Sequence, residues 1–139
     1  GIVRAIEAAA GRANLVSRDH LPRDRFVALL KRLAANGGIL VGNSSSGLIE
    51  AGAVGVGVVN VGDRQSQRER GSNVIDARES AGHIGQAIVH AAGMDATAVR
   101  HPFGDGAAGT AIARHLKGVS LADASLLRKR WALMDEKSS

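Results

Sequence analysis

The segment 38–70 constrains the fold of this chain more than any other stretch of its sequence. It contains an apolar run at 39–42, a serine- and glycine-rich turn at 43–47, a short helical stretch at 48–54 and a second apolar run at 58–61. Apolar runs separated by a helix-length connection do not form a hairpin, so they predict parallel strands joined by a right-handed crossover. The sequence therefore predicts an α/β fold built as a doubly wound parallel sheet.

The rest of the chain continues this alternation. Pro22 suits the first turn of a helix because proline lacks the N–H that would be unpaired there, and Asn36-Gly37-Gly38 ends that helix. Apolar spacing predicts the other elements. We expect helices at 2–10, around 84–91 up to Gly93, at 107–117 and from 120 onward, and strands at 14–17 and 73–77.

Length and composition limit the class of protein. At 139 residues we expect one main domain, 1–118, followed by a C-terminal helix and tail at 119–139. Hydrophobic residues make up 45% but aromatic residues only 2%, which predicts an aliphatic core. The absence of cysteine excludes disulfides and thiolate metal sites and fits a reducing, cytoplasmic location.

Membrane and secretory segments are not expected. No apolar run approaches the roughly 20 residues of a membrane span. The N-terminal apolar stretch is interrupted by Arg4 and Glu7, so it does not read as a signal peptide. We therefore expect no membrane partner.

The net charge of +5 admits a nucleic-acid partner as one interpretation. The basic residues are spread along the chain, however, and aromatic residues are not interleaved with them. Arginines are densest at Arg64, Arg68 and Arg70, a spacing that favours a small polyanion over a nucleic acid. We expect no nucleic-acid partner.

The turn at 43–47 has the residue types of an anion site. A helix start offers unpaired N–H groups and the positive end of the helix dipole, and serine hydroxyls add donors. The alternative is an ordinary helix cap, for which serine is also favoured.

Glu50 is the only charged residue between positions 39 and 62. A carboxylate there can accept hydrogen bonds from ribose hydroxyls, or it can be a solvated helix residue. The arginines at 64–70 can hold an anion, or they can form a solvated basic loop. Taken together, the serine turn, the glutamate and the arginines indicate a site for a nucleotide diphosphate.

Three segments resemble the C-terminal half of the hydrolysing UDP-N-acetylglucosamine 2-epimerases. They are HLPRDRFVALLKR at 20–32, LVGNSSSGLIEAGAVGVGVVNVGDRQSQRERGSNVIDA at 40–77, and PFGDGAAGTAIARHL at 102–116. The GNSSSG turn, Glu50 and the GDRQ loop with Arg68 are the most specific features. Gly57 departs from the family, in which proline is common at that position.

The resemblance implies two Rossmann-like domains in a GT-B-like arrangement, with the C-terminal one holding most of the UDP. Residues 1–118 would be part of that domain, without its first strand. The resemblance assigns the diphosphate to Ser44, Ser45, Arg64 and Arg68, and the ribose to Glu50. It assigns uracil to the loop of Leu21, Pro22, Arg23 and Phe26, although Phe26 also fits a simple core position. The supporting turn comprises Gly42, Asn43, Ser46 and Gly47. Arg70 is expected at the surface.

The activity implied is conversion of UDP-N-acetylglucosamine and water to N-acetylmannosamine and UDP, a reaction type linked to sialic acid biosynthesis. The family's acid/base residues lie earlier in sequence, so we expect no catalytic residue here. We also expect no cofactor and no metal, because the five histidines lack ligand spacing.

The expected partners are UDP or a UDP-N-acetylhexosamine, an N-terminal domain, and further copies of the full enzyme. The sugar stays open between N-acetylglucosamine and a diacetamido derivative. Two alternatives are a stand-alone nucleotide-binding module and the donor domain of a GT-B glycosyltransferase. The GDRQ loop argues against the glycosyltransferase.

Overall fold

The computed structural model describes residues 1–10 and 12–120. The chain divides into two compact units, one from Gly1 to Phe103 and a second that begins at Gly104. The expected helix from residue 120 onward lies outside the described residues.

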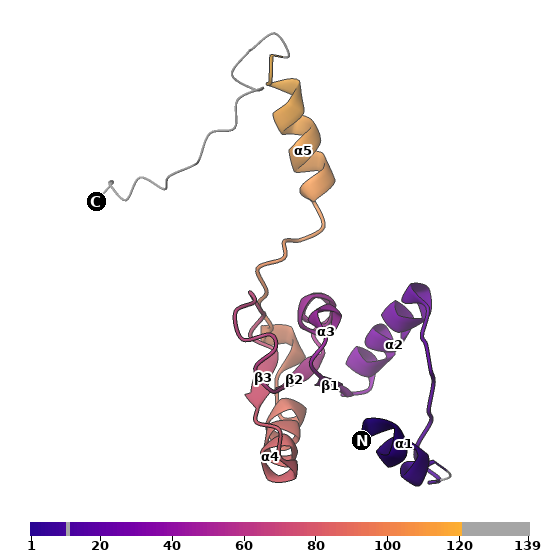
Figure 1. Ribbon diagram of the computed structural model, residues 1–139. Coiled ribbons are helices and arrows are strands. Elements are labelled where there is room, and N and C mark those ends of the chain that lie inside the picture. Colours follow the sequence, from indigo (N-terminus) through magenta and orange to yellow (C-terminus); the bar gives the residue numbers. More distant parts are fainter. Residues whose placement is uncertain (11, 121–139) are drawn as a thin grey trace, which may run out of the picture. The chain divides into compact units, whose positions relative to one another are not determined.

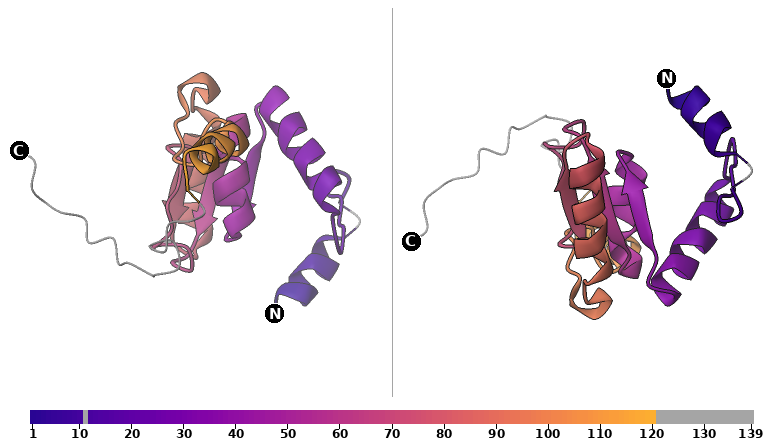
Figure 2. Two further views of the ribbon diagram at one scale, coloured as in Figure 1. Left: turned by 90° about the horizontal axis from the view of Figure 1, so that it is seen from above. Right: turned by 90° about the horizontal axis from the view of Figure 1, so that it is seen from below.

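The first unit contains most of the regular structure (Figures 1 and 2). In chain order its elements are α1 (Ile2–Ala9), α2 (Arg23–Ala35), β1 (Ile39–Gly42), α3 (Ser45–Glu50), the 3₁₀ helix η1 (Gly52–Val54), β2 (Gly57–Val61), β3 (Val74–Ala77), α4 (Ala81–Ala92) and the 3₁₀ helix η2 (Ala96–Ala98). The second unit contains α5 (Ala108–Lys117).

The described strands form one sheet in the order β1-β2-β3, and both pairs are parallel. Val41 lies opposite Val59, and Asn60 lies opposite Asp76. The prediction of a parallel α/β fold is therefore confirmed. Because parallel strands end at the same edge, the turn after β1 and the loop after β2 leave the sheet on one side.

The core has two layers, one on each face of the sheet. Neighbouring residues Val58 and Val59 of β2 are both buried, and their side chains belong to different clusters because strand side chains alternate between faces. One cluster joins Val58 to Leu30 of α2, and the other joins Val59 to Ala87 of α4. Figure 2 shows α4 running alongside the strands. Both clusters are aliphatic, as the composition predicts.

Two glycines permit the tight connection from η1 into β2. Gly55 has φ of +74°, a conformation that favours glycine, and a Cβ there would lie 3.0 Å from the carbonyl oxygen of Ala96. A Cβ at Gly57 would lie 3.1 Å from the carbonyl oxygen of Ala91. The glycine at 57 therefore lets β2 approach the end of α4.

Hydroxyl and carboxylate side chains cap two of the later elements. The Ser80 hydroxyl accepts a hydrogen bond from the backbone N–H of His83 at the start of α4. Asp95 caps η2, where the hydroxyl and backbone N–H of Thr97 donate to its carboxylate at 2.7 and 2.8 Å and lower the pKa of Asp95.

One expectation about local structure is wrong, and another is right about the helix but not about its bounds. Residues 14–17 form no strand; Leu15 is 46% exposed and Val16 is 74% exposed. Four extended residues become a strand only by pairing, and no described strand pairs with them. The helix expected at 48–54 instead begins at Ser45 and continues as η1 after Glu50, because the serine turn supplies its first turn.

Candidate functional site

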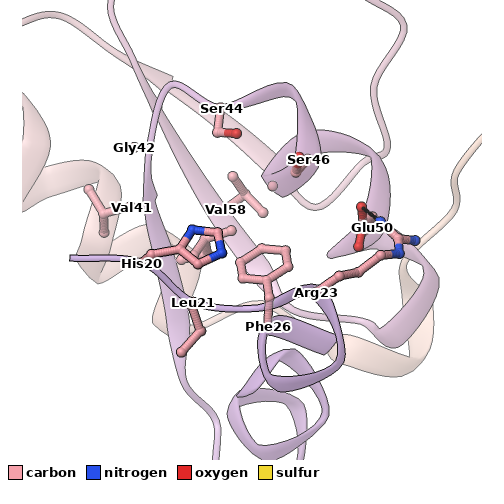
Figure 3. A pocket seen from close by; sticks show the side chains of 12 residues that line it. His20, Leu21, Arg23, Phe26, Val41, Gly42, Ser44, Ser46, Glu50 and Val58 are labelled. Carbon is pink, nitrogen blue, oxygen red and sulfur yellow. Dashed lines mark hydrogen bonds and ion pairs between the residues drawn. The ribbon is translucent and has the colours of Figure 1, made fainter. Parts of the chain in front are cut away.

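A cavity of about 380 Å³ lies beside the serine turn, at the end of β1 (Figure 3). Its lining comes from the segment before α2, the start of α2, β1, the serine turn, α3 and β2. The lining residues are His20, Leu21, Arg23, Phe26, Leu40, Val41, Gly42, Ser44, Ser46, Gly47, Glu50 and Val58.

Most of the residues expected to touch uracil, ribose or the turn line this one cavity. Leu21, Arg23 and Phe26 of the expected uracil loop line the cavity, and so does Glu50 of α3. The residues of the turn that line the cavity are Gly42, Ser44, Ser46 and Gly47. The residues expected at the site that do not line it are Pro22, Asn43, Ser45, Arg64 and Arg68.

Ser44 is the N-cap residue of α3, but its side chain makes no capping hydrogen bond. Ser80, in contrast, caps α4 with its hydroxyl. Ser44 and Ser46 instead lie along the edge of the cavity (Figure 3). Ser44 is therefore a helix-capping residue by position, without the capping hydrogen bond that its hydroxyl could make.

Gly47 has a packing role. It is buried, and a Cβ there would lie 2.7 Å from a methyl group of Leu40. Glycine at this position therefore lets α3 pack closely against β1, which brings the start of α3 to the cavity.

Glu50 is the carboxylate of the cavity. Its side chain is 22% exposed, and the Arg23 guanidinium donates to its Oε1 at 2.9 Å (Figure 3). Arg23 is 78% exposed, so the pair lies at the cavity's solvent edge. This ion pair joins the start of α2 to the end of α3. Glu50 is thus partly buried, and it still has contact with solvent.

The side walls of the cavity are aromatic and aliphatic. Figure 3 shows the rings of His20 and Phe26 between the serine turn and the segment before α2. Phe26 is half-buried and packs against the Leu30 cluster, as its core interpretation predicts, and it also lines the cavity. His20 and Val58 are lining residues that the sequence analysis did not assign.

Arg64 and Arg68 lie on the loop between β2 and β3, and both are exposed. Within the described part of the chain, neither side chain makes a hydrogen bond or ion pair with another residue. They are two cations outside the lining of the cavity. The loop that carries them is linked to the serine turn, because Gln65 Nε2 donates to the Asn43 carbonyl at 3.0 Å.

Gln65 and Arg70 are residues whose importance the sequence analysis missed. Gln65 is 5% exposed. Arg70 is not the surface residue expected, since its side chain is only 21% exposed and pairs with Asp76 of β3. Gln65 stands between Arg64 and Arg68 in the sequence, and nothing in its spacing indicated burial.

Metal and membrane features can be stated for the described ranges 1–10 and 12–120 only. No group of three or more histidine and carboxylate side chains in them could hold a metal ion. None of their helices is both long and apolar enough to cross a membrane.

Comparisons with known proteins agree on one family. Residues 2–117 match the family model described as UDP-N-acetylglucosamine 2-epimerase. A segment of 57 residues is 53% identical to the UDP-N,N'-diacetylbacillosamine 2-epimerase (hydrolyzing) of Legionella pneumophila, covering 41% of this chain and 14% of the relative. A segment of 37 residues is 60% identical to the polysialic acid biosynthesis protein P7 of Escherichia coli, covering 27% of this chain and 10% of the relative.

The matched segments therefore span a small part of these relatives, whereas the family match spans most of this chain. The motifs that line the cavity, from His20 to Val58, all lie within the family match. The chain belongs to the UDP-N-acetylglucosamine 2-epimerase family.

Proposed function

We propose that this chain binds UDP in the cavity beside the serine turn, as the nucleotide-holding part of a hydrolysing 2-epimerase. The observation that carries the proposal is the shared lining: the segment before α2, the serine turn and Glu50 all line one cavity of about 380 Å³. This size falls within the range of about 300–1,000 Å³ that is usual for ligand pockets.

The chemistry of the lining fits the three parts of UDP. Leu21, Phe26 and Val58 offer apolar and aromatic surface to a base. The Glu50 carboxylate can accept hydrogen bonds from ribose hydroxyls, and such bonds to a charged group are worth about 1.5–3 kcal/mol each. The Ser44 hydroxyl and the first N–H groups of α3 can donate to a phosphate.

The diphosphate needs more positive charge than the serine turn provides. Arg64 and Arg68 supply it in this proposal, from a loop that Gln65 links to the Asn43 carbonyl at 3.0 Å. We place the α-phosphate at the turn and the β-phosphate toward the arginines. Their exposure leaves both guanidinium groups free to move toward an anion.

UDP is the leaving group of the proposed reaction, and this determines the role of a chain that holds UDP. In the proposed reaction the sugar C2 proton is removed, UDP is eliminated, and water adds to the resulting glycal, giving N-acetylmannosamine and UDP. Donors that hold the diphosphate stabilise the charge that develops on UDP as the bond breaks. The acid/base groups that move the proton belong to an N-terminal domain outside this chain.

The sugar is either N-acetylglucosamine or a diacetamido derivative. The family description names the first, and the Legionella relative's name states the second. The groups of this cavity face the nucleotide, which is common to both substrates.

A stand-alone nucleotide-binding module is the second candidate, since the shared lining of the cavity supports nucleotide binding whether or not a sugar is converted. The two candidates differ when a complementary N-terminal domain is supplied. An epimerase half then gives N-acetylmannosamine or its diacetamido counterpart, whereas a binding module gives none.

Calorimetric titration of the folded chain tests UDP binding. UDP should bind at least tenfold more tightly than uridine, because charge-assisted hydrogen bonds to phosphate add about 1.5 kcal/mol or more. Ser44→Ala should reduce this preference, and Ser80→Ala, a serine that caps α4 away from the cavity, should leave it unchanged. Equal affinities for UDP and uridine would contradict the proposal.

A further inference from the structure

We propose that Arg70 is a positioning residue, which holds the loop carrying Arg64 and Arg68 and links it to the serine turn. The loop comprises residues 62–70 and is called the arginine loop below. The inference rests on the proposed function, because the arginine loop is the part of the site assigned to the diphosphate. Arg70 itself does not touch the ligand in this proposal.

All three nitrogens of the Arg70 guanidinium group are used inside the protein. Nη1 donates to Asp76 Oδ1 and Oδ2 at 2.6 and 2.7 Å, and Nη2 donates to the Gln65 carbonyl at 2.6 Å. Nε donates to the Arg68 carbonyl at 3.3 Å. The side chain thus closes the arginine loop on itself through two of its carbonyls and fastens it to β3 through a carboxylate.

The anchor on β3 is itself fixed by the sheet. Asp76 lies opposite Asn60 in the parallel register of β2 and β3. Asn60 is fully buried, and its Nδ2 donates to Asp76 Oδ1 at 2.7 Å. The Asp76 side chain is 62% exposed, but one of its carboxylate oxygens is thus hydrogen-bonded to a buried side chain of the neighbouring strand.

The hydrogen bonds that begin at Arg70 continue through Gln65 to the turn beside the cavity. The backbone carbonyl of Gln65 is held by Arg70, and its buried side chain donates to the Asn43 carbonyl at 3.0 Å. Asn43 directly precedes Ser44, a lining residue. Burying a polar group costs free energy unless it is hydrogen-bonded, and this bond satisfies the Gln65 nitrogen, whereas Gln65 Oε1 is buried without a partner among the described residues. Arg70, Gln65 and Asn43 therefore connect the arginine loop to the serine turn.

Arg70 is the arginine of this loop whose side chain holds the loop in place. Arg64 and Arg68 lie four residues apart and lack ion-pair partners in the described part of the chain. A planar guanidinium group can bind two carbonyls and a carboxylate at once, whereas a lysine ammonium cannot span all three. A lysine at position 70 would keep the charge and lose the geometry.

The first test measures the loop without ligand. Amide hydrogen exchange of residues 62–70 in the free, full chain should accelerate at least tenfold in Arg70→Lys. Asp76→Asn, a milder change that keeps an oxygen facing Asn60, should give a smaller acceleration. Arg32→Lys, at an exposed position of α2, is the matched control and should leave the loop unchanged.

The second test measures ligand selectivity. Arg70→Lys should weaken UDP binding by about tenfold, which corresponds to one hydrogen bond to a charged group. Uridine binding should change by less than about twofold, because the ribose and base contacts do not depend on the arginine loop. A purely structural role would lower both affinities together.

The outcomes separate this inference from the proposed function. Wild-type chain that binds UDP and uridine equally contradicts the proposed function. If wild type prefers UDP and Arg70→Lys keeps that preference with unchanged loop exchange, Arg70 acts by charge alone and the inference is wrong. Equal losses for UDP and uridine in both Arg70→Lys and Asp76→Asn would also overturn it.

Discussion

Glu50 is a partly buried, charged residue that lines the cavity. It lies at the end of α3 with 22% of its side chain exposed and with one oxygen bound to Arg23. A carboxylate has two oxygens and can accept several hydrogen bonds, so the Arg23 contact leaves acceptor capacity for a ligand. Ribose hydroxyls are the donors that the proposed function supplies.

This assignment predicts a preference for ribose over deoxyribose. Losing one hydroxyl bonded to Glu50 should weaken binding by roughly tenfold or more, since such bonds contribute about 1.5–3 kcal/mol. Titration of UDP and 2′-deoxy-UDP should show the preference in wild type and a smaller one in Glu50→Gln. Arg64→Ala, the comparison variant, should weaken both nucleotides alike. Full ribose preference in well-folded Glu50→Gln would show that the nucleotide lies in another orientation.

The arrangement of elements was largely predictable from sequence, and its side-chain contacts were not. Apolar runs and crossover lengths predicted β1, β2 and β3 as parallel strands, and several of the turn residues singled out in the sequence line the cavity beside α3. The Arg23–Glu50 and Gln65–Asn43 contacts join residues 27 and 22 positions apart. Such contacts depend on how the helices and strands pack against one another. The periodicity of apolar residues in the sequence predicts each element separately and not this packing. The strand expected at 14–17 failed for the same reason, since pairing is a tertiary property.

The η1–β2 connection gives a prediction at the scale of elements. Gly55→Ala should lower the free energy of unfolding by about 1–2 kcal/mol, the cost of left-handed backbone for a residue with a Cβ. Crowding against Ala96 adds to this, because the new Cβ would lie 3.0 Å from its carbonyl oxygen. Urea denaturation with matched protein concentrations measures the difference.

Gly85→Ala is the matched control for this substitution. Gly85 lies within α4, and nothing lies within 4 Å of where its Cβ would be. Alanine there should raise stability by roughly 0.5–1 kcal/mol, because glycine is a poor helix residue. Equal effects of the two substitutions would mean that the backbone at Gly55 is not as described.

At the scale of the whole molecule, the proposed function gives this chain one part of a larger reaction. Its matched segments span 14% and 10% of the length of the two curated relatives. The proposal assigns nucleotide recognition to the residues that line the cavity, and it assigns the acid/base groups to an N-terminal domain. Nucleotide binding and proton transfer are separable if this division is right.

If nucleotide binding and proton transfer are separable, the chain alone should bind UDP-N-acetylglucosamine without converting it. Purified chain incubated with UDP-N-acetylglucosamine should release UDP no faster than the buffer control, because no general acid and base are placed at the sugar. A coupled assay for UDP provides the measurement. Steady release that disappears in Ser44→Ala would reveal catalytic groups within this chain and refute the division of roles.

The location of the nucleotide is the central claim, and mapping of amide chemical shifts tests it most directly. On addition of UDP to isotopically labelled chain, the largest saturable shifts should fall on Arg23, Gly42, Ser44, Gly47 and Glu50, which line the cavity. Smaller shifts should follow along the arginine loop. Largest shifts around Asp76–Glu79, which line a separate hollow at the ends of β2 and β3, would contradict the account, as would no saturable shift at all.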